Sequence, residues 1–248
     1  MRRITCLAQS ILAAVASILA AIATPAAAQQ VITYEVVTEE IVSETGSDRF
    51  VASGQAVLPK GIARFGPFRV LDTGRAALVD VTDERSPAAF TAMLAAYPAL
   101  ATLEMIECSG TMDDGANLRL GRMIRAKGIA THVPKGGSVR SGGVELFLAG
   151  ARRMADPGAE FAVHAWEDED GKEPGDFAAD APVNRAYLDY YREMGMSAIE
   201  ARAFYDMTNS VANAEAKWLN AAQMGQWVRL DSAKVASSPA LDSARTLR

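Results

Sequence analysis

Cysteine and histidine are scarce in this 248-residue chain. There are two of each, Cys6 and Cys108, and His132 and His164. Zinc sites need three or four such ligands at close spacing, so the sequence predicts no metal site. A basic cluster is missing as well, because 25 basic residues stand against 30 acidic ones for a net charge of −5. We therefore expect no nucleic-acid partner, and nothing in the sequence indicates a cofactor.

Apolar runs are short, and the one near the N-terminus is typical of an export signal. Two arginines precede the alanine-rich stretch 11–22, and small residues follow at 24–28. We predict a signal peptide over 1–28, cut after Ala28, and a periplasmic or secreted protein with no membrane attachment after cleavage. An uncleaved anchor is the alternative. The exported chain would carry a net charge of about −7 and retain only Cys108, which excludes an internal disulfide and favours a buried thiol.

The order of apolar patterns predicts an α/β fold. Residues 29–60 form a β-rich N-terminal addition, residues 61–228 form the main domain, and residues 229–248 form a flexible tail. Within the main domain, strands alternate with helices, which indicates right-handed β-α-β units and a parallel sheet layered by helices. We expect strands at 76–81, 102–106, 130–133 and 161–163, and helices at 86–97, 116–126, 182–194 and 197–208.

Residues 136–166 contain the strongest candidates for chemistry. Ser141 is followed by two glycines and the apolar run 144–149, which predicts a buried helix that begins at the serine. The N–H groups at such a helix start stabilise a negative oxygen. His164 ends the predicted strand 161–163, at the edge where parallel sheets carry site residues. Two structural alternatives remain, because serine is a common helix cap and a lone histidine is often a hydrogen-bonded structural residue.

A family resemblance rests on the residues of this region, namely Ser141, Gly142, the segment 144–150, Arg153 and His164. Together they resemble the active-site core of Clp-type serine peptidases, and more closely that of secreted, ATP-independent relatives in the Clp/crotonase superfamily. The likeness covers about residues 69–225. It implies a Clp/crotonase-like layered fold, Ser141 as nucleophile, His164 as base, a peptide or protein substrate and a homo-oligomer.

The resemblance also implies an oxyanion hole. In the Clp family, one backbone N–H comes from a Ser-Pro-Gly-Gly loop, and this chain has Ser-Gly-Thr-Met at 109–112. The loop donor then falls on Met112, and the second donor is Gly142. The family also has an aspartate before an aromatic residue, where this chain has Ala216 and Lys217 before Trp218. For the residue that orients the histidine we place Glu215 first, and the alternatives are Asn213, Asn209, Asp206 or a dyad with no third residue.

Two functions follow from these residues. The first is an exported, ATP-independent serine hydrolase, in the first place a peptidase, that uses Ser141 and His164. The second is a catalytically lapsed relative that binds peptide or protein partners in the same groove. Cys108 as an alternative nucleophile and a crotonase-type acyl-CoA enzyme rank below both. We interpret the acidic run 167–170 as a solvated loop, since it does not fit the spacing of a calcium loop.

Overall fold

The computed structural model describes residues 57–232, which belong to one compact unit. The predicted signal peptide, most of the predicted N-terminal β segment and the predicted tail beyond residue 232 lie outside the described residues. Over the described range, no helix has the length and apolar character needed to cross a membrane.

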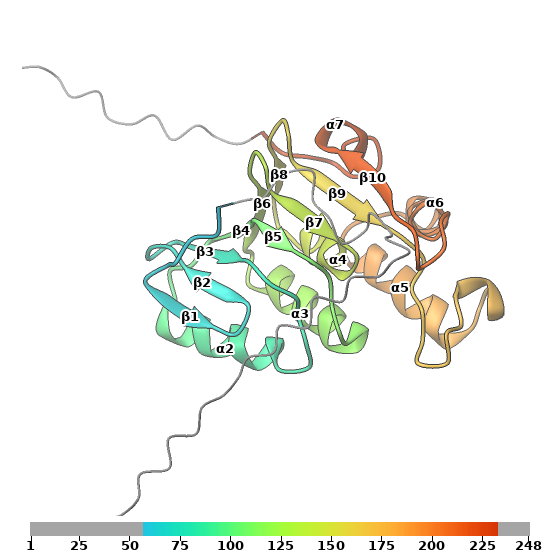
Figure 1. The fold of residues 1–248 in the computed structure, drawn as a ribbon, viewed down its shortest axis with the longest axis horizontal. Coiled ribbons are helices and arrows are strands. Elements are labelled where there is room, and N and C mark those ends of the chain that lie inside the picture. Colours follow the sequence, from blue (N-terminus) through green and yellow to red (C-terminus); the bar gives the residue numbers. More distant parts are fainter. Residues whose placement is uncertain (1–56, 233–248) are drawn as a thin grey trace, which may run out of the picture. The chain divides into compact units, whose positions relative to one another are not determined.

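Two sheets form the framework, and both are largely parallel (Figure 1). The first has six strands in the order β1-β2-β3-β4-β6-β8, in which β3, β4, β6 and β8 run parallel. The second has the order β10-β9-β7-β5, in which only β10 is antiparallel to its neighbour. The strands are β1 (Ala63–Phe65), β2 (Phe68–Val70), β3 (Arg75–Leu78), β4 (Thr102–Met105), β5 (Glu107–Cys108), β6 (Ala130–Val133), β7 (Ser138–Arg140), β8 (Arg153–Ala155), β9 (Glu160–Val163) and β10 (Lys217–Asn220).

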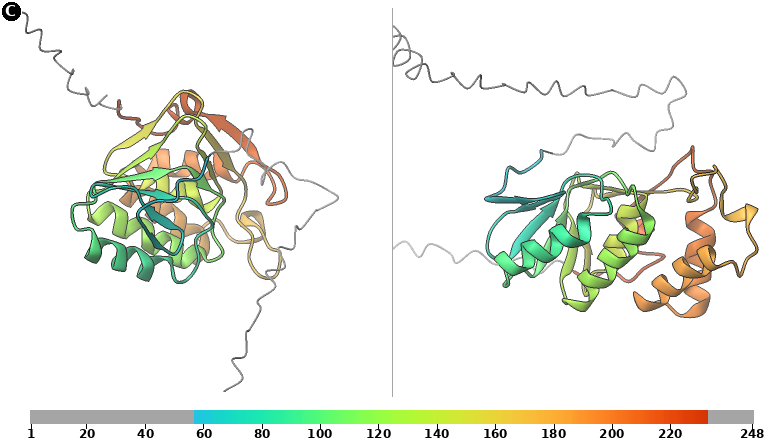
Figure 2. Two further views of the ribbon diagram at one scale, coloured as in Figure 1. Left: turned by 60° about the vertical axis from the view of Figure 1, so that its left-hand side comes forward. Right: turned by 90° about the horizontal axis from the view of Figure 1, so that it is seen from below.

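Most of the helices lie on one side of the sheets, below them in the left-hand view of Figure 2. They are α2 (Ser86–Ala96), α3 (Asp114–Ala126), α4 (Gly142–Leu148), α5 (Pro182–Glu193) and α6 (Ala198–Thr208). The short helix α7 (Ala221–Met224) lies beside β10 in Figure 1, and a 3-10 helix, η2, spans Pro174–Asp176. Helix α4 connects β7 to β8 and β9, so its first turn lies at the carboxyl end of the second sheet. This edge is where the residues after parallel strands converge.

The predicted α/β order of strands and helices is confirmed. Helix α2 begins with a proline in its first turn, and Asp113 caps α3 by accepting the Ala116 N–H at 2.7 Å. The predicted strand at 130–133 matches β6. Strands β1, β2, β5, β7, β8 and β10 are not among the predicted strands. Each has two to four residues, a length at which few strands show a recognisable pattern. The division into two sheets was therefore not predicted either.

An aromatic core joins α5 and α6 to α4. Tyr190, Tyr191 and Phe204 are fully or almost fully buried, as the apolar spacing of these helices predicts. The Tyr190 hydroxyl donates to the Glu145 carbonyl at 2.6 Å. Buried Tyr190 thus fixes helix α4, which follows Ser141.

Helix α3 leaves room for Tyr190 only because residue 121 is glycine. A Cβ at Gly121 would lie 1.9 Å from the Tyr190 hydroxyl oxygen. We expect Gly121→Ala to lower the free energy of unfolding by about 1–3 kcal/mol, because overpacking against a rigid buried ring outweighs the gain of up to about 1 kcal/mol in helix propensity. Urea denaturation measures this. Gly115→Ala on the same helix is the matched control, since the nearest atoms to its Cβ belong to the Asp113 and Arg119 side chains at 3.3 Å or more. Equal stability of the two variants would contradict the prediction.

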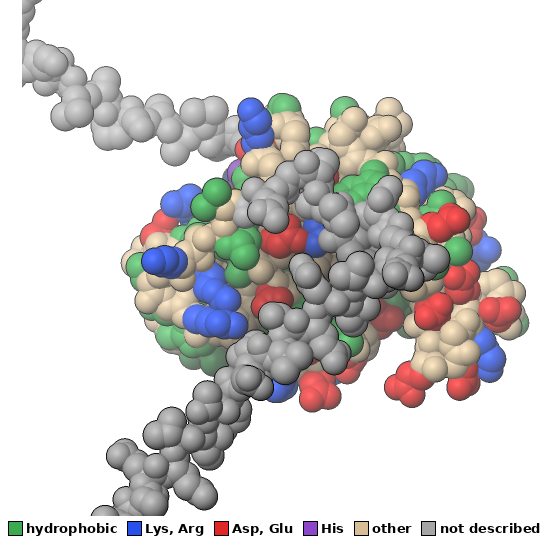
Figure 3. Space-filling model, viewed as in Figure 1, with side chains coloured by type: hydrophobic (Ala, Val, Ile, Leu, Met, Phe, Trp, Pro, Cys, Tyr) green, Lys and Arg blue, Asp and Glu red, His purple; other side chains and the backbone are tan. Residues whose placement is uncertain are grey.

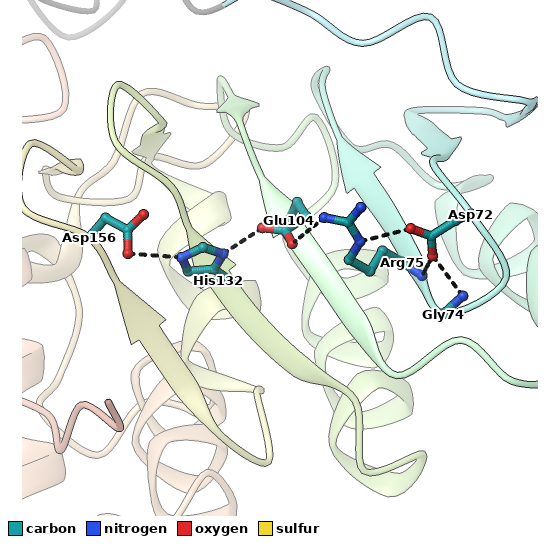
Figure 4. A network of polar contacts seen from close by, with 6 residues as sticks. All are labelled: Asp72, Gly74, Arg75, Glu104, His132 and Asp156. Carbon is teal, nitrogen blue, oxygen red and sulfur yellow. Dashed lines mark hydrogen bonds and ion pairs between the residues drawn. The ribbon is translucent and has the colours of Figure 1, made fainter. Parts of the chain in front are cut away.

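A polar network crosses the first sheet on strands β3, β4 and β6 (Figure 4). His132 Nδ1 lies 2.6 Å from Glu104, and its Nε2 lies 3.2 Å from Asp156. The second contact is an ion pair without hydrogen-bond geometry, because Nε2 has no hydrogen-bond partner among the described residues. Glu104, and then Asp156, raise the pKa of His132 against the opposing effect of burial. Arg75 extends the network to Asp72. His132 thus bridges Glu104 and Asp156 across the sheet, which is a structural role.

Candidate active site

Ser141 stands at a sharp turn between strand β7 and helix α4. Its backbone has φ 49° and ψ −131°, and no other non-glycine residue in the range 57–232 has a positive φ. Such a conformation costs a residue with a side chain on the order of 1–3 kcal/mol. A strained serine between a strand and a helix is the arrangement that exposes the nucleophile in α/β hydrolases.

The alternative that Ser141 is only a helix cap is not supported. Across the described part of the chain, no N–H of α4 donates to the Ser141 hydroxyl. A capping serine also takes an extended backbone, whereas this one lies in the left-handed region. The turn is instead held by the backbone, since the Ser141 N–H donates to the Ala162 carbonyl at 2.9 Å and its carbonyl accepts from Val144 at 2.8 Å. The hydroxyl is left for another role.

The residue after the serine is glycine because the neighbouring loop passes against it. A Cβ at Gly142 would lie 2.5 Å from a methyl carbon of Thr111. The Gly142 carbonyl accepts a hydrogen bond from Asn117 Nδ2 at 2.7 Å, and Asn117 Oδ1 in turn accepts one from Thr82 Oγ1 at 2.9 Å. Asn117 and Thr82 are both buried. This chain of hydrogen bonds fixes the start of α4, where the N–H groups of the first turn have no partner within the helix.

His164 follows the neighbouring strand β9. Arg140 and Ala162 are paired in the register of β7 and β9, so Ser141 and His164 come directly after the carboxyl ends of adjacent parallel strands. The structure thus places the two sequence-predicted residues in the lining of one pocket. His164 Nδ1 lies 2.8 Å from the Ala165 carbonyl oxygen, which can only accept. The proton is therefore assigned to Nδ1, which leaves the lone pair on Nε2, as a base for serine requires.

Asn213 is the polar side chain that the structure brings against His164. Its Nδ2 donates to the Ala165 carbonyl at 2.9 Å and lies 3.3 Å from His164 Nδ1. Its backbone N–H donates to Glu173 at 2.6 Å. For the residue that orients His164, the sequence analysis places Glu215 first and Asn213 among the alternatives. Glu215 is exposed and does not occur among the described residues that line the pocket.

The two predicted oxyanion donors are placed differently. Gly142 lines the pocket beside Ser141. The Met112 N–H instead donates to the Thr82 carbonyl at 2.8 Å, and the Met112 side chain is 79% exposed. Met112 is not in the described lining of the pocket, where Thr111 takes its place. The structure therefore brings one predicted donor to the serine and engages the other elsewhere.

The pocket has a volume of about 240 Å³ and is acidic and aromatic. Glu145 is buried in it, and burial raises the pKa of its carboxyl from 4.5 to about 7 against the hydrogen bond from Tyr191. Asp114 and Glu167 are exposed residues of its lining, and desolvation by the surrounding protein also raises the pKa of the Asp114 carboxyl. Tyr187 and Tyr191 line it as well, so these tyrosines are part of the site as well as of the core. Glu145 is not among the sequence-predicted site residues, and the signal that could have identified it is its charge within the apolar run 144–149.

Two other residues near the serine have structural roles. Arg140 is buried, donates to Ser138 Oγ at 2.7 Å and pairs with Glu107. Cys108 is buried, as predicted, and burial raises the pKa of its thiol far above the ordinary value. Neither lines the pocket within the described residues, and a buried thiol of raised pKa is a poor nucleophile. Among residues 57–232, no cluster of His, Cys, Asp and Glu could hold a metal ion.

No protein-family model and no curated protein matches this chain. Among solved structures, a mutant of ClpP1 from Listeria monocytogenes has a TM-score of 0.45 and 16% identity, and the match covers 63% of this chain and 88% of that one. A mutant of the 1510-N membrane-bound stomatin-specific protease, in complex with a substrate peptide, has a TM-score of 0.38 and 12% identity. That match covers 59% of this chain and 70% of that one. Another mutant of that protease has a TM-score of 0.41 and 13% identity, and the match covers 61% of this chain and 74% of that one. At these TM-scores the likeness carries no functional argument.

Proposed function

We propose that the protein is an exported, ATP-independent serine hydrolase that cleaves peptide bonds and acts as a homo-oligomer. The observation that carries the proposal is the strained backbone of Ser141 beside His164 in one pocket. A strained, uncapped serine between a strand and a helix needs a reason, and presentation of a nucleophile supplies one. Export is supported by the N-terminal sequence, and the homo-oligomer by the resemblance to Clp-type peptidases.

The mechanism assigns one step to each group. Ser141 Oγ attacks the carbonyl carbon while His164 Nε2 takes the hydroxyl proton. The Gly142 N–H stabilises the oxyanion, and the Met112 N–H joins it only if its hydrogen bond to Thr82 opens. The C–N bond then breaks, and the leaving amine takes the proton from His164. Water then attacks the acyl-Ser141 ester while His164 takes its proton. His164 returns that proton to Ser141 Oγ as the ester bond breaks and the acid is released.

The test is covalent labelling with a fluorophosphonate, which reports an activated serine without knowledge of the substrate. We expect the full exported chain to gain the mass of one adduct, which peptide mapping assigns to Ser141. The Ser141→Ala variant should gain none. Ser210→Ala is the matched control, because the Ser210 hydroxyl donates to the Met207 carbonyl and lies outside the described pocket lining, and it should label like the wild type.

A second candidate function is peptide binding without turnover. It is favoured by the engaged Met112 N–H and by an asparagine, instead of a carboxylate, beside His164. A folded protein that gives no adduct with the fluorophosphonate would exclude the hydrolase and leave this candidate. Turnover of any peptide that requires Ser141 would exclude the binding protein.

A further inference from the structure

We propose that the pocket selects a lysine or arginine side chain next to the scissile bond, and that its substrates are basic peptide segments. The inference rests on the proposed function, because Ser141 defines which bond is cleaved. Glu145 is the group that binds the cation. Asp114 and Glu167 guide it in from the surface.

The position of Glu145 relates it directly to the nucleophile. It lies in the first turn of α4, four residues after Ser141, and both residues line the pocket. Its side chain is held by the Tyr191 hydroxyl, which donates to Oε1 at 2.8 Å. Its backbone is held by the Tyr190 hydroxyl, which donates to the carbonyl oxygen. Only 8% of the residue is exposed, and it lines the pocket. A substrate side chain that extends from the carbonyl at Ser141 therefore meets a fixed carboxyl group.

No basic residue of the described chain forms an ion pair with the acids of the pocket. Within residues 57–232, none of the salt bridges includes Glu145, Asp114 or Glu167. Asp114 disfavours the charged form of Glu145, and Asp113 does the same for Asp114. A buried carboxyl among like charges is stabilised by a cation that enters from outside. A lysine or arginine of a substrate would supply that cation.

The walls of the pocket fit the stem of such a side chain. Val144, Val163 and Trp166 line it together with the rings of Tyr187 and Tyr191. Lysine and arginine bury their methylene groups against apolar surface while the charged end reaches a polar partner. An aromatic face near the cation adds to the attraction. The combination of apolar walls and one buried acid matches a long cationic side chain better than an anionic one.

A larger groove continues from this pocket, and it too is acidic. It has a volume of about 860 Å³ and shares Asp114 and Glu167 with the pocket. Its only basic residue in the described chain is Arg85, which already pairs with Asp83 at 2.8 Å. Acidic side chains gather on the lower right of the face in Figure 3. The further acids of the groove are Asp83, Glu84, Asp113, Asp168 and Glu169. A mainly acidic groove that adjoins the pocket favours a substrate with several basic residues.

The experiment compares two covalent probes, the diphenyl phosphonates of lysine and of norleucine, which differ in the terminal amine. Each reacts with an activated serine and releases phenol. Labelling rates are measured on the full exported chain and divided by the fluorophosphonate rate of the same variant, so that a change in nucleophile reactivity cancels. We expect the lysine probe to react at least about tenfold faster than the norleucine probe.

Variants assign the preference to its residues. Glu145→Gln should reduce the lysine preference by about tenfold, and Asp114→Asn and Glu167→Gln should reduce it less. Asp189→Asn is the matched control, because Asp189 is an exposed acid on α5 that pairs with Arg192 and lies outside both cavities as the structure describes them. It should leave the preference unchanged. If Glu145→Gln does not fold, the two outer variants and the salt dependence of the preference still test the inference.

The outcomes separate this inference from the proposed function. Fluorophosphonate labelling of Ser141 with equal or reversed probe rates would overturn the basic specificity and leave the hydrolase. If no fluorophosphonate adduct forms, the hydrolase fails. The specificity is then tested by the anisotropy of two fluorescein-labelled peptides, one with lysines and one with norleucines. Tighter binding of the lysine peptide that is lost in Glu145→Gln would support the pocket's specificity, and equal binding would overturn it.

Discussion

His164→Ala is expected to lower the rate of fluorophosphonate labelling and of any hydrolysis that Ser141 performs by about 10²–10⁴-fold, the range typical of a lost general base. His164 follows the strand next to Ser141 and carries its proton on Nδ1, so Nε2 is the basic atom. The fold should persist, because His164 is only partly buried. Circular dichroism and the urea midpoint check this. A rate within about twofold of the wild type would exclude His164 as the base.

Asn213 is expected to act as a positioning residue for His164, and a series of variants separates it from Glu215. Asn213→Ala should lower the labelling rate by about tenfold, because the Ala165 carbonyl that accepts from His164 loses its second donor. Asn213→Asp should move the acidic limb of the pH profile to higher pH, since a carboxylate raises the pKa of a neighbouring imidazole. Glu215→Gln should change neither rate nor profile. A loss of activity in Glu215→Gln alone would restore the sequence-based choice.

The second large effect is on stability, and it comes from Glu145. Burial raises the pKa of this carboxyl from 4.5 to about 7, so between these pH values the folded chain binds more protons than the unfolded chain. The stability contribution is therefore fully present below about pH 4.5 and is lost as the pH rises through about 7. At 1.36 kcal/mol for each pKa unit, the loss is roughly 3 kcal/mol.

Glu145→Gln removes this titration while keeping an oxygen that accepts from Tyr191. The free energy of unfolding, measured by urea denaturation from pH 4 to pH 8, should fall less steeply with pH in Glu145→Gln than in the wild type. His132 is present in both proteins, so the difference between the two curves reports Glu145 together with its coupling to Asp114. The Asp189→Asn control should follow the wild-type curve. Parallel curves for wild type and Glu145→Gln would contradict a buried, protonated Glu145.

The local patterns of the sequence determined most of the fold. The helices α2, α3, α5 and α6 are long enough for a period of 3.6 residues to appear, and proline and aspartate mark the starts of α2 and α3. The alternation of strands with helices then limits the topology to parallel crossovers. Burial of Cys108 also follows from the sequence, because an apolar environment protects a single thiol.

The candidate site was only partly predictable, because local patterns show contacts between residues that are close in sequence and not between distant ones. Ser141 and His164 stand in recognisable local contexts, a glycine-flanked helix start and a strand end. The partner of His164 is different, because Asn213 reaches it from a loop 49 residues away and nothing in the local sequence prefers it to Glu215. The Met112 N–H is likewise engaged by Thr82, which is distant in sequence.

The sequence by itself determined the class of fold and the two residues that we propose to react. Only the tertiary structure decided the strained backbone of Ser141, the contact of Asn213 with His164, and the burial of Glu145 beside Tyr191. The physical reason is range. Helix and strand periods, caps and turns depend on neighbours a few residues apart, whereas strain, desolvation and the pKa of a buried acid depend on groups that the fold brings together from distant positions.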